Sequence, residues 1–127
     1  MLVIISAYVF TILSVIIILF QLGLTVGMPW GKASMGGKYP GKYPPKMRVV
    51  SLVNIFVLII IALIVLIKAN IIFPQIKNIS GIAIYFVVGF SVLATILNII
   101  TPSKIERIIW TPVTTLLLLT STIVAFG

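Results

Sequence analysis

The side chains that could carry out chemistry are few in this chain. Its 127 residues include one acid, Glu106, and no aspartate, histidine or cysteine. A hydrolase uses paired carboxylates or a nucleophile activated by histidine, and a metal centre uses a cluster of His, Cys or acidic ligands. The sequence contains neither set, and it has no glycine-rich phosphate loop of recognised spacing. We therefore expect a protein that is not an enzyme and that holds no metal or cofactor.

The single acid lies at the start of an apolar run, which argues against a proton-coupled pump built on a mid-membrane carboxylate. Ser103 precedes Glu106 by three residues, so one interpretation is a capping box at a helix N-terminus. The other interpretation is a bidentate ion pair with Arg48, which we place on the same side of the membrane. The sequence favours the two about equally.

Other polar and aromatic side chains gather near those ends of the apolar runs that share a side with Glu106. In a bundle, helix ends on one side lie close together, so we expect these residues to form a site for a ligand or a protein partner. The candidates are Gln21, Trp30, Lys32, Arg48, Ser51, Asn54, Asn98, Glu106, Arg107 and Trp110.

One long polar segment, residues 27–48, interrupts the apolar sequence. It carries five of the nine basic residues and no acid, and it contains a tandem repeat, GKYP at 37–40 and again at 41–44. We expect a polyproline-like strap at headgroup depth, with its tyrosines in an interfacial aromatic belt. Lys38, Lys42 and Lys46 are the predicted contacts for anionic lipid headgroups. A second interpretation makes part of this loop the rim of a binding site, through Pro29, Trp30, Lys32, Gly36 and Gly37.

The elements that must position these residues are apolar runs. The chain is 61% hydrophobic and 8% charged, far from soluble averages, and crossing a membrane takes about 20 apolar residues. We predict four spanning helices, at 2–26, 49–69, 79–100 and 107–126, in a single all-α, four-helix integral membrane bundle covering residues 1–127. Each run carries one stripe of small or polar residues, which we expect to face the other helices. In the third run, Gly81, Tyr85 and Gly89 lie four residues apart, a spacing typical of close helix packing.

The basic residues also predict the orientation. Loop 27–48 and loop 101–106 share one side and, together with Arg107 directly after the second loop, hold seven of them, whereas the other side holds Lys68 and Lys77. The positive-inside rule places the seven in the cytoplasm and both termini outside the cell membrane. Short basic loops beside spanning helices act as topology signals and lipid contacts, so we do not expect nucleic acid as a partner of this +8 chain.

A set of positions spread along the chain resembles the pattern of an uncharacterised family of small four-helix integral membrane proteins of bacteria. The resemblance supports the topology and implies no activity. It rests on Pro29-Trp30-Gly31, Gly36-Gly37, Pro44-Pro45, Arg48, Ser51, Asn98, Ser103, Glu106-Arg107, Trp110 and Pro112.

Two functions follow from these observations. The first is a non-enzymatic interaction or structural protein whose basic cytoplasmic face meets anionic lipid headgroups or a protein partner. The alternative is a small-molecule or ion transporter or channel subunit that acts as a homo-oligomer, with its inward polar stripes lining a path. Whether those stripes enclose a cavity or close on one another distinguishes the two.

Overall fold

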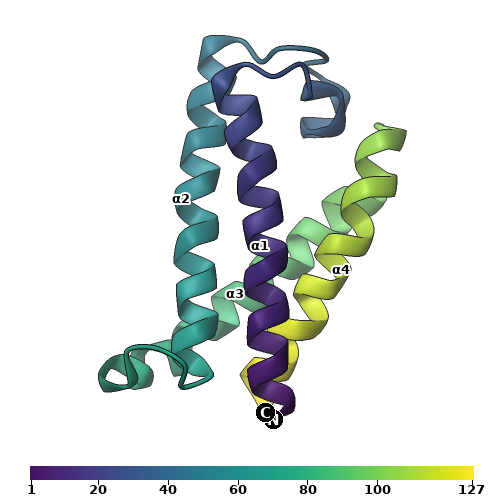
Figure 1. Cartoon of the computed structure of the whole chain (residues 1–127). Coiled ribbons are helices and arrows are strands. Elements are labelled where there is room, and N and C mark those ends of the chain that lie inside the picture. The colour runs from purple at the N-terminus through teal and green to yellow at the C-terminus, as the bar shows by residue number, and fades with distance from the viewer.

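The computed structural model describes all residues 1–127 and contains four long α-helices and no strand (Figure 1). The helices are α1 (Leu2–Val26), α2 (Pro45–Lys68), α3 (Lys77–Ile100) and α4 (Lys104–Phe126). Each is long and apolar enough to cross a membrane. The prediction of an all-α, four-helix membrane bundle is therefore confirmed.

The helix boundaries differ from the prediction mainly at the N-terminal ends. The α2 helix begins at Pro45, four residues early, because the fixed φ of proline suits the first helical position. The α4 helix begins at Lys104, where the Ser103 Oγ accepts the Glu106 backbone N–H at 3.2 Å. Ser103 is thus the N-cap that the sequence indicated, although its own N–H donates to Thr101 Oγ1 and not to Glu106.

The helices form two antiparallel pairs that meet at one end of the molecule. The α1 helix packs along α2, and α3 packs along α4, whereas α2 and α4 barely touch. In Figure 1, α4 leans away from α1 towards the end opposite the termini, and loop 27–44 fills the resulting gap.

An apolar core fills the half of the bundle nearer the termini. Because all four helices contribute to it, the bundle is closed there by direct side-chain packing. Its buried members are Ala7, Phe10, Leu58, Ile61, Val65, Ala69, Ile84, Val87, Leu117, Val124 and Ala125.

The stripe of Gly81, Tyr85 and Gly89 was predicted to pack closely against another helix. Within one chain this prediction is wrong. A Cβ atom added at Gly81 or Gly89 would meet nothing within 4 Å, and Tyr85 is 54% exposed. Helical spacing predicts that a face exists, and α3 buries another face instead. That inward face carries Ser80, Ile84, Val87, Ser91 and Thr95.

Loop 27–44 is not the polyproline-like strap that its composition suggested. It contains two short 3₁₀ turns, Gly31–Ala33 and Met35–Gly37, and the Gly31 N–H donates to the Gly41 carbonyl at 2.9 Å. The chain thus turns back on itself, and Gly36 adopts a positive φ of 68° that favours glycine. This folded segment, residues 31–41, forms a lid over the open end of the bundle.

Candidate functional site

The lid is fastened to the start of α4 by three hydrogen bonds. Ser103 Oγ donates to the Lys32 carbonyl at 2.6 Å, and Trp110 Nε1 donates to the Ala33 carbonyl at 2.9 Å. The Gly36 N–H donates to Glu106 Oε2 at 3.1 Å. Residues 70 or more positions apart in sequence are joined in this way, so α4 fixes the position of the lid.

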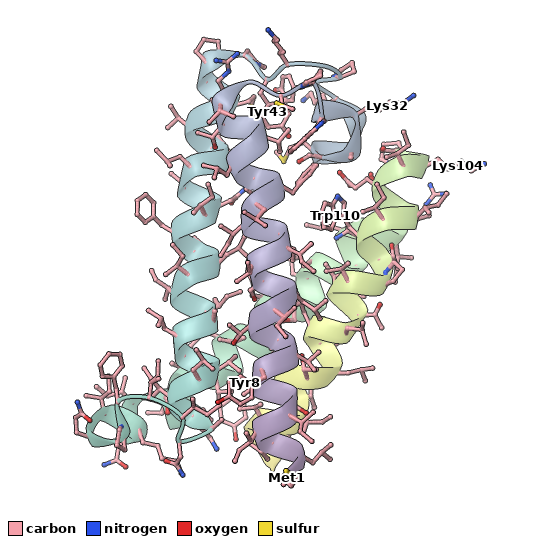
Figure 2. All side chains as sticks on the ribbon, in the orientation of Figure 1. Met1, Tyr8, Lys32, Tyr43, Lys104 and Trp110 are labelled. Atoms are coloured by element: carbon pink, nitrogen blue, oxygen red, sulfur yellow. The ribbon has the colours of Figure 1, made fainter.

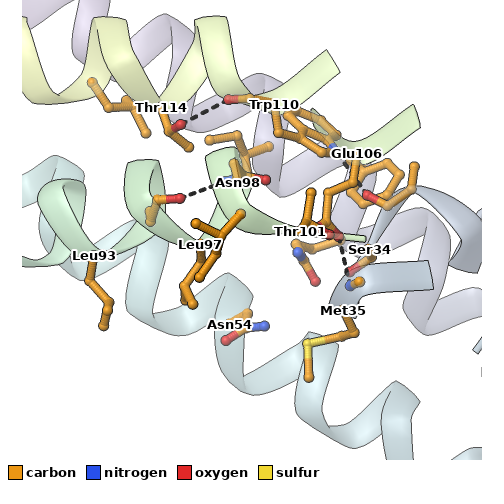
Figure 3. Close-up of a pocket in the computed structure, with 18 of the residues that line it drawn as sticks. Ser34, Met35, Asn54, Leu93, Leu97, Asn98, Thr101, Glu106, Trp110 and Thr114 are labelled. Carbon is orange, nitrogen blue, oxygen red and sulfur yellow. Dashed lines mark hydrogen bonds between the residues drawn. The ribbon is translucent and has the colours of Figure 1, made fainter. Parts of the chain in front are cut away.

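Beneath the lid lies a cavity of about 580 Å³. The lid covers it with Ala33, Ser34, Met35 and Gly36, and all four helices contribute to its wall (Figure 3). Its volume falls within the range of roughly 300 to 1,000 Å³ that is typical of small-molecule sites.

One wall of the cavity faces outward from the bundle. Leu93 and Leu97 of α3 line the cavity and are more than half exposed, and Phe90 one turn below Leu93 is also exposed. These side chains lie on a helix that is long and apolar enough to span a membrane, so the surface they present is suited to hydrocarbon. The cavity is therefore exposed on the side where a membrane would lie, while the lid covers its end.

The structure brings half of the candidate site residues together. Each helix contributes one carboxamide or carboxylate to the cavity, and Trp110 packs its ring against Phe20 with centroids 4.7 Å apart. Asn54 is the deepest, nine residues into α2, or about 13 Å along the helix axis. The candidates that line the cavity are Gln21, Asn54, Asn98, Glu106 and Trp110.

The other five candidates lie outside this cavity. Trp30 and Lys32 line a separate hollow of about 350 Å³, which shares Phe20 and Ala33 with the cavity. Ser51 is buried in α2. Arg107 is exposed, and its Nη2 donates to the Thr101 carbonyl at 2.6 Å. Arg48 closes the end of loop 27–44, where its Nε donates to the Tyr43 carbonyl at 2.9 Å.

The Arg48–Glu106 ion pair is therefore wrong, although loop 27–48 and α4 are joined through the same carboxylate. Glu106 accepts a backbone N–H from Gly36, while Arg48 is committed to a backbone carbonyl in its own loop. Backbone amides satisfy a carboxylate well, and sequence patterns do not show which amide approaches. The competing interpretation, helix capping, is correct for the Glu106 backbone N–H, which donates to Ser103 Oγ. It does not predict that the Glu106 side chain accepts from Gly36.

The predicted headgroup residues Lys38, Lys42 and Lys46 are all exposed at the lid end, and Lys38 Nζ lies 6.0 Å from the centre of the Tyr39 ring. Figure 2 shows Lys32 and Lys104 also pointing away from the bundle at this end.

Tyr43 departs from the predicted aromatic belt. It is 2% exposed and packs with Leu24 and Met47 under the loop, because the lid folds over it.

Sequence reasoning missed three lid residues that cover the cavity, Ala33, Ser34 and Met35, whereas the second interpretation of the loop included Gly36. Gly36-Gly37 was the available signal, because adjacent glycines mark a backbone that turns tightly or approaches another group closely. Their partner, Glu106, could not be identified from that signal.

Comparison with protein-family models, with curated proteins and with solved structures finds no match to this chain. Function must therefore be inferred from the cavity, the lid and the charges around them. The cavity is apolar over most of its wall and carries a few polar side chains, and the exposed Lys38, Lys42 and Lys46 lie at the same end of the bundle. Such an arrangement is suited to an amphipathic molecule.

Proposed function

We propose that this protein is a non-enzymatic membrane protein that binds a phospholipid at its lid end. The observation that carries the proposal is the largely apolar cavity of about 580 Å³, part of whose wall, at Leu93 and Leu97, is exposed on the outside of the bundle. An acyl chain occupies the cavity between α2 and α3, and the phosphate stays at the basic face.

Access favours a lipid over a water-soluble ligand. Leu93 and Leu97 form a wall that is exposed to the hydrocarbon region when the helices span a membrane. A lipid tail can enter such an opening directly from the membrane without crossing water. Once inside, the tail covers the hydrophobic surface of the wall. The lid restricts entry from the aqueous side.

Charge favours an anionic phosphate at the rim. The exposed lysines of the loop, together with Lys104 and Arg107, have no acidic neighbour outside the cavity. Each cation near an anionic surface contributes about 1 kcal/mol of attraction. We place this end in the cytoplasm, because seven of the nine basic residues lie on it, and both termini on the opposite side.

The alternative function, a transporter or channel subunit, has less support. Buried hydroxyls of the polar stripes bond to carbonyls of their own helices, as Ser14 Oγ does to Phe10 at 2.8 Å and Ser91 Oγ to Val87 at 2.9 Å. The apolar core fills the half of the bundle beyond the cavity. A path would therefore have to form between copies of a homo-oligomer and not within one chain.

Lipid retention by the purified protein tests the proposal. Ala94 lines the cavity, so Ala94→Phe should fill part of it and reduce the number of phospholipids that native mass spectrometry detects after delipidation and re-addition. Val92→Phe is the matched control, because Val92 lies on the same helix, is exposed and does not line the cavity. Equal retention by the two variants would contradict a lipid site in the cavity.

The basic face is tested separately. Replacing Lys38, Lys42 and Lys46 with glutamine should lower the preference for phosphatidylglycerol over phosphatidylcholine. High salt should lower the remaining preference further, because it screens the exposed charges. Because these side chains are exposed, the melting temperature should hardly change. An unaltered preference would leave the three lysines as topology signals only.

A further inference from the structure

The polar groups of the cavity are incompletely satisfied by the protein itself. Asn98 Nδ2 donates to the Ala94 carbonyl at 2.7 Å, and one Glu106 oxygen accepts the Gly36 N–H. Figure 3 shows Asn54 facing the same space with no hydrogen bond drawn to it. Unpaired amides and carboxylates are costly in apolar surroundings, so the cavity presents acceptors that a ligand could use.

The charge inside the cavity is opposite to the charge outside it. Glu106 is 8% exposed, it is the only charged residue in the lining, and neither nearby arginine pairs with it. A carboxylate with one backbone N–H and no cation is poorly compensated at the edge of a membrane. The lining therefore disfavours an anionic group and favours a cationic hydrogen-bond donor.

A second buried polar atom lies under the lid. The Tyr43 hydroxyl is buried without a hydrogen-bond partner. Burial raises the pKa of Tyr43, the neighbouring Ser34 side chain opposes this change, and the negative charge of Glu106 adds to the increase. Ser34 lines the cavity, whereas Tyr43 lies behind it and is buried with Leu24 and Met47.

We infer that the cavity selects a phospholipid whose headgroup carries a primary ammonium, which donates its N–H groups to the Glu106 carboxylate and to carboxamide oxygens of the same lining. This inference rests on the proposed function and adds the headgroup chemistry. The phosphate of such a lipid remains among the exposed basic side chains at the lid end. The ammonium thus meets the Glu106 carboxylate inside the cavity, and the phosphate meets cations outside it.

The chemistry of the lining separates this ligand from two others. A metal ion is disfavoured because the chain offers no group of three acidic, histidine or cysteine ligands, whereas hard cations take six or more oxygens. A choline headgroup carries the same charge as an ammonium but has no N–H to donate, so it cannot satisfy the carboxylate by hydrogen bonding.

A competition between two lipids with identical acyl chains tests the inference. The full chain in detergent is given phosphatidylethanolamine and phosphatidylcholine in equal amounts, and the bound species are counted by native mass spectrometry. We expect wild type to prefer phosphatidylethanolamine, and Glu106→Gln to reduce that preference roughly tenfold, the effect of losing one charge-assisted hydrogen bond. The glutamine oxygen still accepts from Gly36, so the lid should stay closed.

A second variant and a soluble competitor complete the test. Asn54→Leu removes a carboxamide from the cavity and leaves the hydrogen bonds between the lid and α4 in place. It should lower the preference for phosphatidylethanolamine several-fold. Phosphoethanolamine, which has the headgroup and no tail, should not displace the lipid. Displacement would overturn the lipid as the source of the ammonium.

The outcomes separate this inference from the proposed function. If Glu106→Gln and Asn54→Leu keep the wild-type preference while Ala94→Phe still loses lipid, the ammonium site is wrong and the lipid cavity stands. If Ala94→Phe and Val92→Phe retain the same amount of lipid, the cavity is not a lipid site and both proposals fail.

Discussion

Replacing Gly31 with alanine should detach the lid from the bundle. A Cβ atom at this position would lie 1.8 Å from the Tyr39 carbonyl oxygen and 2.8 Å from the Gly41 carbonyl oxygen. Both atoms belong to the backbone, so no side-chain rotation can relieve the overlap. The two ends of the lid, around Gly31 and Gly41, must separate, and the Gly31–Gly41 hydrogen bond of 2.9 Å is lost.

The cost follows from the bonds that depend on this turn. Separation at Gly31 displaces the adjoining lid carbonyls that accept from Ser103 and Trp110, and it weakens the contact of Gly36 with the Glu106 carboxylate. Neutral hydrogen bonds contribute about 0.5 to 1.5 kcal/mol each, and those to a charged group about 1.5 to 3 kcal/mol. Because some anchors can re-form, we expect Gly31→Ala to lower the free energy of unfolding by about 2 to 4 kcal/mol.

Denaturant unfolding in mixed micelles measures this loss, and hydrogen exchange of the Gly36 amide reports whether the lid opens. Gly41→Ala is the matched control in the same loop, because its added Cβ would meet nothing within 4 Å. Its φ of +79° adds strain of about 1 kcal/mol only. If Gly31→Ala costs no more than Gly41→Ala, or if the Gly36 amide stays protected, the lid is not held as described.

Two further predictions concern charge. Arg48→Gln and Glu106→Gln should lower thermal stability additively, to within about 0.5 kcal/mol, because the two side chains bond to different groups; a larger coupling in a double-mutant cycle would restore the ion pair. Single cysteines replacing Pro40 and Asn78, both exposed in a chain without cysteine, should report topology. A membrane-impermeant thiol reagent applied to intact cells should label position 78 and spare position 40, and the reverse would refute the orientation.

The sequence predicted the features that are encoded locally. Spanning helices follow from runs of about 20 apolar residues, and α1 matches its predicted bounds of 2–26. The Ser103 cap follows from residues three positions apart. Alternating helix direction also placed Gln21, Asn54 and Asn98 at the same end, and the structure brings them to one cavity.

Features that depend on which surfaces meet could not be predicted in the same way. The lid contacts α4 through backbone carbonyls and a backbone amide, and any residue type supplies those groups. Arg48 was chosen as the partner of Glu106 because side-chain charge is visible in a sequence, whereas the N–H of Gly36 is not. The burial of Tyr43 likewise depends on the lid closing above it.

Glu106 has two oxygens with different surroundings, and this difference makes the lid and the ligand separable. One oxygen accepts from Gly36 in the lid, while the carboxylate as a whole contributes the only charge inside the cavity. Glutamine at this position keeps an acceptor for the lid and removes the charge, whereas alanine at Gly31 displaces the lid and keeps the charge. If the ligand is held by charge, the first substitution should reduce headgroup preference roughly tenfold and the second should mainly speed lipid exchange. Opposite effects would mean that the lid, and not the carboxylate, selects the lipid.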